Sequence, residues 1–235
     1  MTLLLAAVAV AVGAAAQSVS GIGFALVAGP LLFTVFGPRE GVRAAVVLSM
    51  LVNVAVLVRE HRAVMVRRLL PVLLSALLAT PFLVALLDGV HTRVLRAAAG
   101  AVIVVGAGLV AAGRARDTGT AGGVVAGVAS ATMNVLASAG GPAIAVYASG
   151  ARWDPDRLRA TLQAYFLALN VVTLLTLGPP TWSIARATVL VAALVVGSGV
   201  GAVLSRRVSP ARARTVTLVL AAAGGLSVFL SALVG

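Results

Sequence analysis

Two clusters of small and polar residues interrupt the longest uncharged stretches of this chain, which are 1–38 and 118–151. The first break comprises Gln17, Ser20, Gly21, Gly23 and the following Phe24, and the second break comprises Asn134, Ser138, Gly140, Gly141 and Pro142. Glycine lets a helix end and turn inside an apolar stretch, and proline suits the first turn of the next helix. That helix starts with unpaired N–H groups and a positive dipole end, so two such starts brought together would bind a small anion.

Three further amide side chains, those of Asn53, Gln163 and Asn170, lie deep in uncharged sequence. An unpaired buried amide costs about 1–3 kcal/mol, so each of them needs a hydrogen-bond partner. That partner is either a neighbouring helix or a substrate, and the sequence leaves both interpretations open. We therefore count these amides among the candidate substrate-binding residues, together with the two breaks.

The remaining reactive side chains form no catalytic or metal-binding pattern. The chain has no cysteine, and its two histidines, His61 and His91, lie far apart in loops. The sequence contains no Ser/His/Asp set, no metalloprotease helix and no Walker loop, and no carboxylate lies inside an uncharged run. The sequence therefore predicts no metal site, no cofactor and no enzymatic activity.

Composition indicates a membrane protein. The chain has 235 residues, of which 61% are hydrophobic and 10% charged, and a soluble domain of this length could not bury so much apolar surface. Backbone polar groups in hydrocarbon need internal partners, and continuous runs rich in Ala, Leu and Val favour helices over a barrel. The uncharged runs are 1–38, 44–58, 69–87, 97–113, 118–151, 160–185, 187–205 and 215–235. We expect an all-α integral membrane protein of the inner (plasma) membrane, surrounded by lipid.

The net charge of +12 could also indicate binding to nucleic acid. All 18 basic residues are arginines, however, and they lie in short loops between the apolar runs. This distribution is typical of the positive-inside bias, in which the more basic loops of a membrane protein face the cytoplasm. No nucleic-acid partner is therefore predicted.

The second half of the chain matches the first at a nearly constant offset. At 117 residues the pairs are Gln17 and Asn134, Gly23 and Gly140, Pro38 and Pro155, and Asn53 and Asn170, and at 118 they are Arg96 and Arg214, and Gly106 and Gly224. Gln163 is the exception among the amides, because it corresponds to Val46. Repeats of this kind define an architecture, so we interpret 1–113 and 118–235 as two repeats within one transmembrane domain.

The distribution of arginines favours one course of the chain over another. If each broken run crosses the membrane once, the two richest loops, 59–68 and 205–214, fall on opposite sides. If each broken run instead enters and returns as a hairpin, the loops 59–68, 113–117, 150–159 and 205–214 share a side and hold 13 of the 18 arginines. The hairpin interpretation leaves three full crossings in each half, which makes the repeats inverted, and it places both termini on the outer face.

Four segments resemble the TauE/SafE family, the sulfite exporter group also called the toluene sulfonate uptake permeases. They are Gly21–Leu32, Ser138–Pro142 in its Gly-Gly-Pro form, Arg159–Gln163 with Asn170 beyond it, and Gly197–Gly201 through Arg207. The chain departs from the family's fuller glycine cluster where Phe24 and Ala25 follow Gly23. The resemblance implies transport of small sulfur-containing anions, such as sulfite, thiosulfate or organosulfonates, with the glycine-rich segments near the substrate.

These observations predict a secondary transporter that works by alternating access around a site at the two breaks. A non-transporting membrane scaffold or accessory subunit is the alternative from another class, and a passive anion channel is a variant of the first interpretation. The sequence leaves open the substrate, the direction of transport, a coupling ion (proton or sodium) and assembly into a homo-oligomer.

Overall fold

The computed structural model describes residues 2–20, 24–113 and 117–234, and within them every regular element is a helix. The first half contains α1 (Thr2–Ser20), α2 (Phe24–Phe36), α3 (Pro38–Glu60), the short 3-10 helix η1 (His61–Ala63), α4 (Val66–Leu87) and α5 (Thr92–Ala112). The second half contains α6 (Gly119–Ala137), α7 (Gly141–Gly150), α8 (Pro155–Leu177), α9 (Ile184–Leu204) and α10 (Pro210–Val234).

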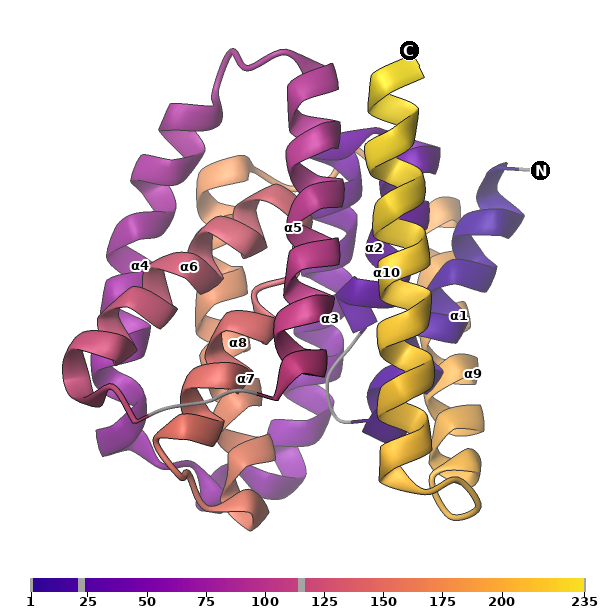
Figure 1. Cartoon of the computed structure of the whole chain (residues 1–235). Helices are drawn as coiled ribbons and strands as arrows, with labels where there is room; N and C mark the ends of the chain where they lie inside the picture. Colours follow the sequence, from indigo (N-terminus) through magenta and orange to yellow (C-terminus); the bar gives the residue numbers. More distant parts are fainter. Residues whose placement is uncertain (1, 21–23, 114–116, 235) are drawn as a thin grey trace.

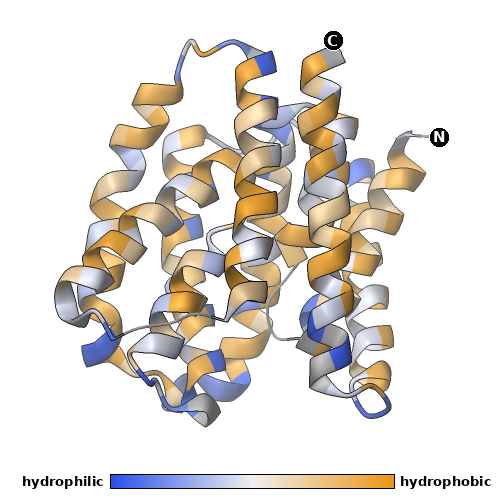
Figure 2. Cartoon of the chain, in the orientation of Figure 1, coloured by the Kyte–Doolittle hydropathy of each residue, from blue (hydrophilic) through white to orange (hydrophobic). Residues whose placement is uncertain are grey.

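Eight of these helices are long and apolar enough to cross a membrane, namely α1, α3, α4, α5, α6, α8, α9 and α10. Large apolar side chains such as Leu78, Phe82 and Leu175 are exposed on the outside of the bundle. Figure 2 shows hydrophobic residues along the helices and hydrophilic residues gathered near their ends. Lipid must cover this outer surface. The prediction of an all-α membrane protein is confirmed.

The helix bounds follow the offset found in the sequence. α6 and α8 begin and end 117 residues after α1 and α3, and α9 and α10 begin 118 residues after α4 and α5. Each half therefore has the same order of elements, a long helix, a short helix and three long helices. The division into repeats 1–113 and 118–235 stays a prediction, as does a symmetry axis relating them.

The equivalent helices α3 and α8 pack side by side and run in opposite directions (Figure 1). An arginine near the start of each helix donates hydrogen bonds to a carbonyl near the end of the other. At one end Arg43 Nε donates to Leu177 O at 2.9 Å, and at the other Arg157 Nε donates to Ala63 O at 3.0 Å. A cation at a helix C-terminus is favourable, so these two contacts join the halves at both ends.

The pair α5 and α10 repeats this arrangement. Arg93 Nε donates to Ala232 O at 2.6 Å near the end of α10, and Arg214 Nη2 donates to Val110 O at 2.6 Å near the end of α5. Each half thus contributes two arginines that bind the last turn of a helix in the other half. We call these four contacts the cross-half arginine caps.

The first break produces a hairpin, because α2 returns along α1. A Cβ at Gly13 of α1 would lie 2.9 Å from the Phe24 carbonyl oxygen and 2.9 Å from Cβ of Ala28, both in α2. Farther along, Ala6 and Val10 share a buried cluster with Leu32. Positions later in α2 therefore meet positions earlier in α1, as in an antiparallel pair.

The second break also produces a hairpin. Tyr147, near the end of α7, donates from its hydroxyl to Gly119 O at the start of α6, at 3.3 Å. Ser130 Oγ, in the later part of α6, donates to Gly140 O at 2.8 Å. Both broken runs therefore enter the bundle and return, and neither continues as a single kinked helix.

The two ends of the bundle differ in charge. The loops 59–68, 150–159 and 205–214 lie at one end, and both chain termini lie at the other (Figure 1). These three loops contain 11 arginines, whereas the opposite end has five: Arg39, Arg43, Arg93, Arg96 and Arg186. Arg114 and Arg116, also expected at the first end, lie outside the described residues. We call the two ends arginine-rich and arginine-poor.

The first arm of each hairpin packs against a helix of the other half. α1 lies on α9, where Gly201 brings its backbone against Ala15, and α6 lies on α4, where Gly127 meets the carbonyl of Val72. Small residues at such crossings let helix backbones approach closely in a membrane. Each hairpin is therefore packed against the half of the chain to which it does not belong.

Candidate functional site

A cavity of about 50 Å³ lies where the two breaks meet α3 and α8. Eight residues proposed from the sequence line it: Gln17, Phe24, Asn53, Asn134, Ser138, Gly140, Gly141 and Asn170. The remaining lining residues are Ala25, Leu26, Ser49, Val52, Ala139 and Phe166. We call this space the central cavity. The fold thus brings both breaks and both members of the Asn53–Asn170 pair to one place.

Of the described candidates, Pro142 and Gln163 do not line the central cavity. Pro142 lies in the first turn of α7, where its ring packs against Gly106 of α5. Gln163 is fully buried in α8 but lies away from the cavity. Ser20 is the last residue of α1. Gly21 and Gly23 fall outside the described residues.

The sequence analysis missed two polar or aromatic contributors to the cavity, Ser49 and Phe166. Ser49 precedes Asn53 by four residues on α3, and Phe166 precedes Asn170 by four on α8. Residues four apart lie on the same helix face. The helical period around the two asparagines is therefore the signal that would have identified both residues.

The second break is a tight turn between two helices. α6 ends at Ala137, and Ser138 adopts the left-handed conformation with φ 53°, donating its N–H to Asn134 O at 2.7 Å. Gly140 lies so close to α6 that a Cβ there would be 2.7 Å from Ser130 O. No side chain of the described residues caps the start of α7. The first N–H groups of α7 are therefore available at the cavity wall.

The first break is organised differently. Phe24 N–H, at the start of α2, donates to Gln17 Oε1 at 3.1 Å. The Gln17 side chain thus reaches across the turn and satisfies one N–H group that a helix start would otherwise leave unpaired. The α2 start reaches the cavity, but one of its donors is already occupied.

An amide network fixes the wall formed by α6 and α8. Asn134 Nδ2 donates to Asn170 Oδ1 at 3.1 Å and to Thr173 Oγ1 at 3.0 Å. Thr173 in turn donates to Leu169 O at 2.8 Å. Both amide hydrogens of Asn134 are used within the protein, so its orientation is determined and its Nδ2 has no hydrogen left for a ligand.

Two buried donors at the cavity lack a partner among the described residues. They are Asn53 Nδ2 and Ser138 Oγ, in residues that are 3% and 6% exposed. A buried polar group without a hydrogen bond costs about 1–3 kcal/mol, and a ligand that accepts hydrogen bonds would recover this free energy. The cavity therefore presents unsatisfied donors together with the uncapped start of α7.

The central cavity has no formal charge, because none of the residues that line it in the described chain is ionisable. The electrostatic features left are the helix starts, whose dipoles carry about half a positive charge each. Across the described segments, no group of three or more His, Cys, Asp or Glu residues could hold a metal ion. Hydrogen-bond donors and helix dipoles in a site without carboxylates favour a small anion.

The family assignment agrees with this chemistry. A family model described as sulfite exporter TauE/SafE matches residues 5–228 of the chain. The chain belongs to the TauE/SafE family. No curated protein and no solved structure gives a significant match. TauE/SafE proteins are membrane permeases for sulfite or related sulfur anions, so membership indicates a transporter.

The segments that resemble the TauE/SafE family lie in different parts of the fold. The Gly-Gly-Pro segment forms the turn between α6 and α7 at the central cavity, and the segment from Arg159 to Gln163 lies near the start of α8, the helix that carries Asn170. Segment Gly197–Gly201 serves another purpose, since it packs α9 against α1. These segments of the chain therefore include residues at the cavity and residues that pack against the first hairpin.

Proposed function

We propose that this protein is a secondary transporter of small sulfur-containing anions, and that it binds them in the central cavity. The anion accepts hydrogen bonds from the N–H groups at the start of α7 and from the side chains of Asn53 and Ser138. The main support for this proposal is that two buried donors without partners lie beside an uncapped helix start, in a cavity without charged side chains.

Cavity size favours compact anions among the sulfur compounds. A volume of about 50 Å³ corresponds to about three to five water molecules, at roughly 10–15 Å³ for each water. Sulfite and thiosulfate have a comparable number of heavy atoms, whereas organosulfonates carry additional carbon atoms. We therefore propose sulfite or thiosulfate as the preferred class, with organosulfonates requiring a wider cavity.

The proposed mechanism is alternating access, in which the two halves rock around the central cavity. Elements of both halves line the cavity, and each hairpin packs on a helix of the other half. Such packing supports a coupled movement of the hairpins. The source of energy is proposed to be a gradient of the substrate itself or of a coupling ion, proton or sodium.

The deciding experiment is transport into proteoliposomes with labelled sulfite, thiosulfate, sulfoacetate and phosphate. We expect saturable transport of sulfite or thiosulfate, slower transport of sulfoacetate and little of phosphate. Exchange of labelled for unlabelled anion against a gradient would separate a transporter from a passive channel. Absence of flux for every sulfur anion, with the protein correctly inserted, would refute the proposal and favour the scaffold interpretation.

We further propose that the protein lies in the inner membrane with its arginine-rich end in the cytoplasm and both termini outside. Single cysteines can be placed in loops 59–68 and 205–214, because the chain has no native cysteine. An impermeant thiol reagent applied outside intact cells should modify neither position and should modify both after permeabilisation. Labelling of one loop alone from outside would contradict this topology.

A further inference from the structure

A second cavity, of about 350 Å³, opens at the arginine-poor end between α3, α4, α5, α6 and α8. Within the described residues its ionisable lining consists of Arg39, Arg43 and Asp88, and Glu40 pairs with Arg43 beside it, so each arginine has one carboxylate partner. We call it the Arg39 cavity. It is larger than the central cavity, and no part of the proposed transport site accounts for it.

The position of these arginines is unusual for a membrane protein. Basic residues concentrate at the cytoplasmic end, and here the arginine-poor end has five of the 18 arginines. Two of these five, Arg39 and Arg43, line the same cavity one helical turn apart on α3. Two arginines that line one cavity, at the end where basic residues are fewer, indicate a function specific to that cavity.

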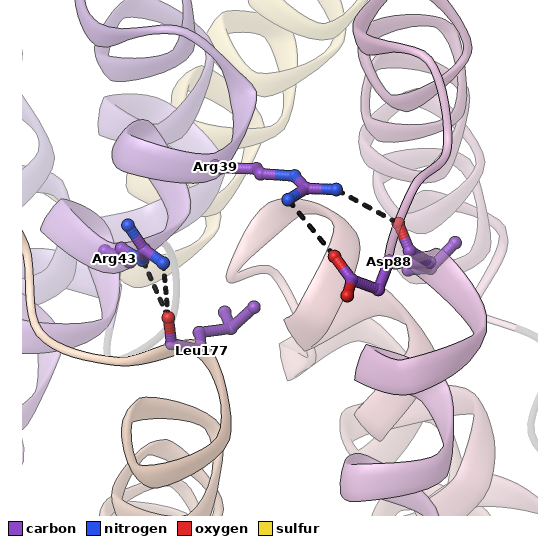
Figure 3. A network of polar contacts seen from close by, with 5 residues as sticks. Arg39, Arg43, Asp88 and Leu177 are labelled. Carbon is purple, nitrogen blue, oxygen red and sulfur yellow. Dashed lines mark hydrogen bonds and ion pairs between the residues drawn. The ribbon is translucent and has the colours of Figure 1, made fainter.

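The two arginines differ in how firmly they are held (Figure 3). Arg43 donates through Nε to Leu177 O at 2.9 Å and pairs through Nη1 with Glu40 Oε1 at 2.6 Å, and its side chain is 26% exposed. Glu40 is itself fixed, because its Oε2 accepts from Thr181 N–H at 3.1 Å. Arg43 is therefore a structural link between α3 and the end of α8.

Arg39 makes weaker contacts. Its Nη1 lies 3.3 Å from Asp88 Oδ1 and its Nη2 lies 3.5 Å from Leu87 O, and the two side chains of the ion pair are 50% and 78% exposed. Exposed ion pairs of this kind contribute little to stability. An anion from solution could replace the Asp88 carboxylate on Arg39 without disturbing the surrounding fold.

The Arg39 cavity adjoins the wall of the central cavity. Its lining includes Leu136, two residues after Asn134 on α6, and Thr176, one turn after Thr173 on α8. Residues of α3, α6 and α8 thus line both the central cavity and the Arg39 cavity.

We infer that the Arg39 cavity is an outer binding site for the transported oxyanion, at which Arg39 exchanges Asp88 for the substrate. This inference rests on the proposed function. Asp88 then acts as a competitor that holds Arg39 in place when the site is empty. Arg39 binds the anion by a charge-assisted hydrogen bond, while the central cavity binds it through backbone and neutral side chains.

The test measures exchange of labelled thiosulfate and of labelled sulfite in proteoliposomes. The substrate concentration is varied on the side of the membrane that carries the termini. Arg39→Gln removes the cation, and we expect the half-saturation concentration on that face to rise about two- to fivefold, the value of an exposed ion pair. Asp88→Asn removes the competitor, and we expect the half-saturation concentration to fall. The maximal exchange rate should change little in either variant.

The opposite signs distinguish binding from structure. If the pair only tied α3 to the α4–α5 loop, both variants would lose the same contact and shift transport in the same direction. Arg186→Gln is the control for charge, because Arg186 lies at the same end but packs over the Phe36 ring, 5.4 Å from its centroid, outside this cavity.

Each outcome is decisive. Equal shifts in Arg39→Gln and Asp88→Asn, or shifts no larger than in Arg186→Gln, would overturn the outer site and leave the proposed transporter intact. Absence of saturable exchange in the wild-type protein would refute the proposed function, and the outer site with it. A rise with Arg39→Gln, a fall with Asp88→Asn and no change with Arg186→Gln would establish the site.

Discussion

The two hairpins occupy corresponding places in the chain but present different chemistry to the central cavity. In the first, Gln17 accepts a hydrogen bond from the N–H of Phe24 and so caps the start of α2. In the second, Asn134 stands at the corresponding position, yet its side chain binds Asn170 and Thr173 on α8. The start of α7 has no side-chain cap within the described chain.

The difference indicates a division of labour between the hairpins. An amide that caps its own hairpin reduces the donors available to a ligand, whereas an amide that binds a neighbouring helix leaves those donors available and stiffens the wall. We therefore expect the second hairpin to provide most of the anion's hydrogen bonds, with the first closing the opposite side. The following variants test whether the second hairpin contributes more to anion binding than the first.

The largest effect should come from Gly141→Leu. The leucine side chain would occupy space at the start of α7 where backbone N–H groups must reach the anion. We expect uptake per folded molecule to fall by about 100-fold or more, the effect of removing donors to an oxyanion. Uptake is measured in proteoliposomes, with folding judged by monodispersity in detergent.

Two glycines of α5 serve as controls for that variant. A Cβ at Gly108 meets nothing within 4 Å in the described chain, so Gly108→Leu should transport normally. A Cβ at Gly106 would lie 2.7 Å from Met133 Cε and 2.9 Å from Pro142 Cγ, so Gly106→Leu should lower yield more than specific activity. Normal transport by Gly141→Leu would exclude the α7 start as the binding site.

The next effect separates two asparagines. Asn134→Ala removes two hydrogen bonds and leaves buried partners on α8 unsatisfied, so we expect a loss of stability of about 1–3 kcal/mol. Asn53→Ala removes an Nδ2 group that has no partner in the described structure, so we expect little loss of stability but a half-saturation concentration raised about tenfold. Thermal unfolding in detergent and concentration-dependent uptake measure the two quantities. Equal stability losses would contradict this distinction.

A smaller effect is expected for Gln17→Ala. Loss of the cap should destabilise the protein by about 1 kcal/mol, the usual value for a helix N-cap. The same change exposes the Phe24 N–H to the cavity, so apparent affinity should be kept or improved while the unfolding temperature falls. A loss of affinity larger than that of Asn53→Ala would show that the first hairpin carries the substrate contacts.

The smallest effects on substrate affinity are expected at the connections that follow the hairpins. A single residue, Gly37 with φ 81°, joins α2 to α3, whereas residues 151–154 join α7 to α8 and include Arg152 with φ 49°. Gly37→Ala should destabilise the protein by about 1–3 kcal/mol without changing substrate affinity, because only glycine adopts that conformation readily. Arg152→Gly should change stability by less than about 1 kcal/mol. Thermal unfolding measures the stability of both variants. A change in substrate affinity in Gly37→Ala would show that the connection between α2 and α3 affects the binding site.

The sequence predicted the elements better than their contacts. Uncharged runs, breaks and the offset of 117 located the helices and brought Asn53, Asn134 and Asn170 into one site, because those signals depend on position along the chain. The offset could not distinguish the cap made by Gln17 from the network made by Asn134, since the direction of a side chain depends on its neighbours in space. The sequence placed the arginines in short loops, but it could not show that Arg43 binds a carbonyl of the other half.

The cross-half arginine caps have a consequence for the order of folding. Arg43 and Arg93 are synthesised long before the carbonyls of α8 and α10 that they bind. Likewise, the carbonyls of Ala63, after α3, and of Val110, in α5, are synthesised before Arg157 and Arg214, which bind them. A first half inserted alone therefore lacks these four contacts until the second half has been synthesised. Assembly is completed after synthesis, when the second half arrives and the two halves cap each other.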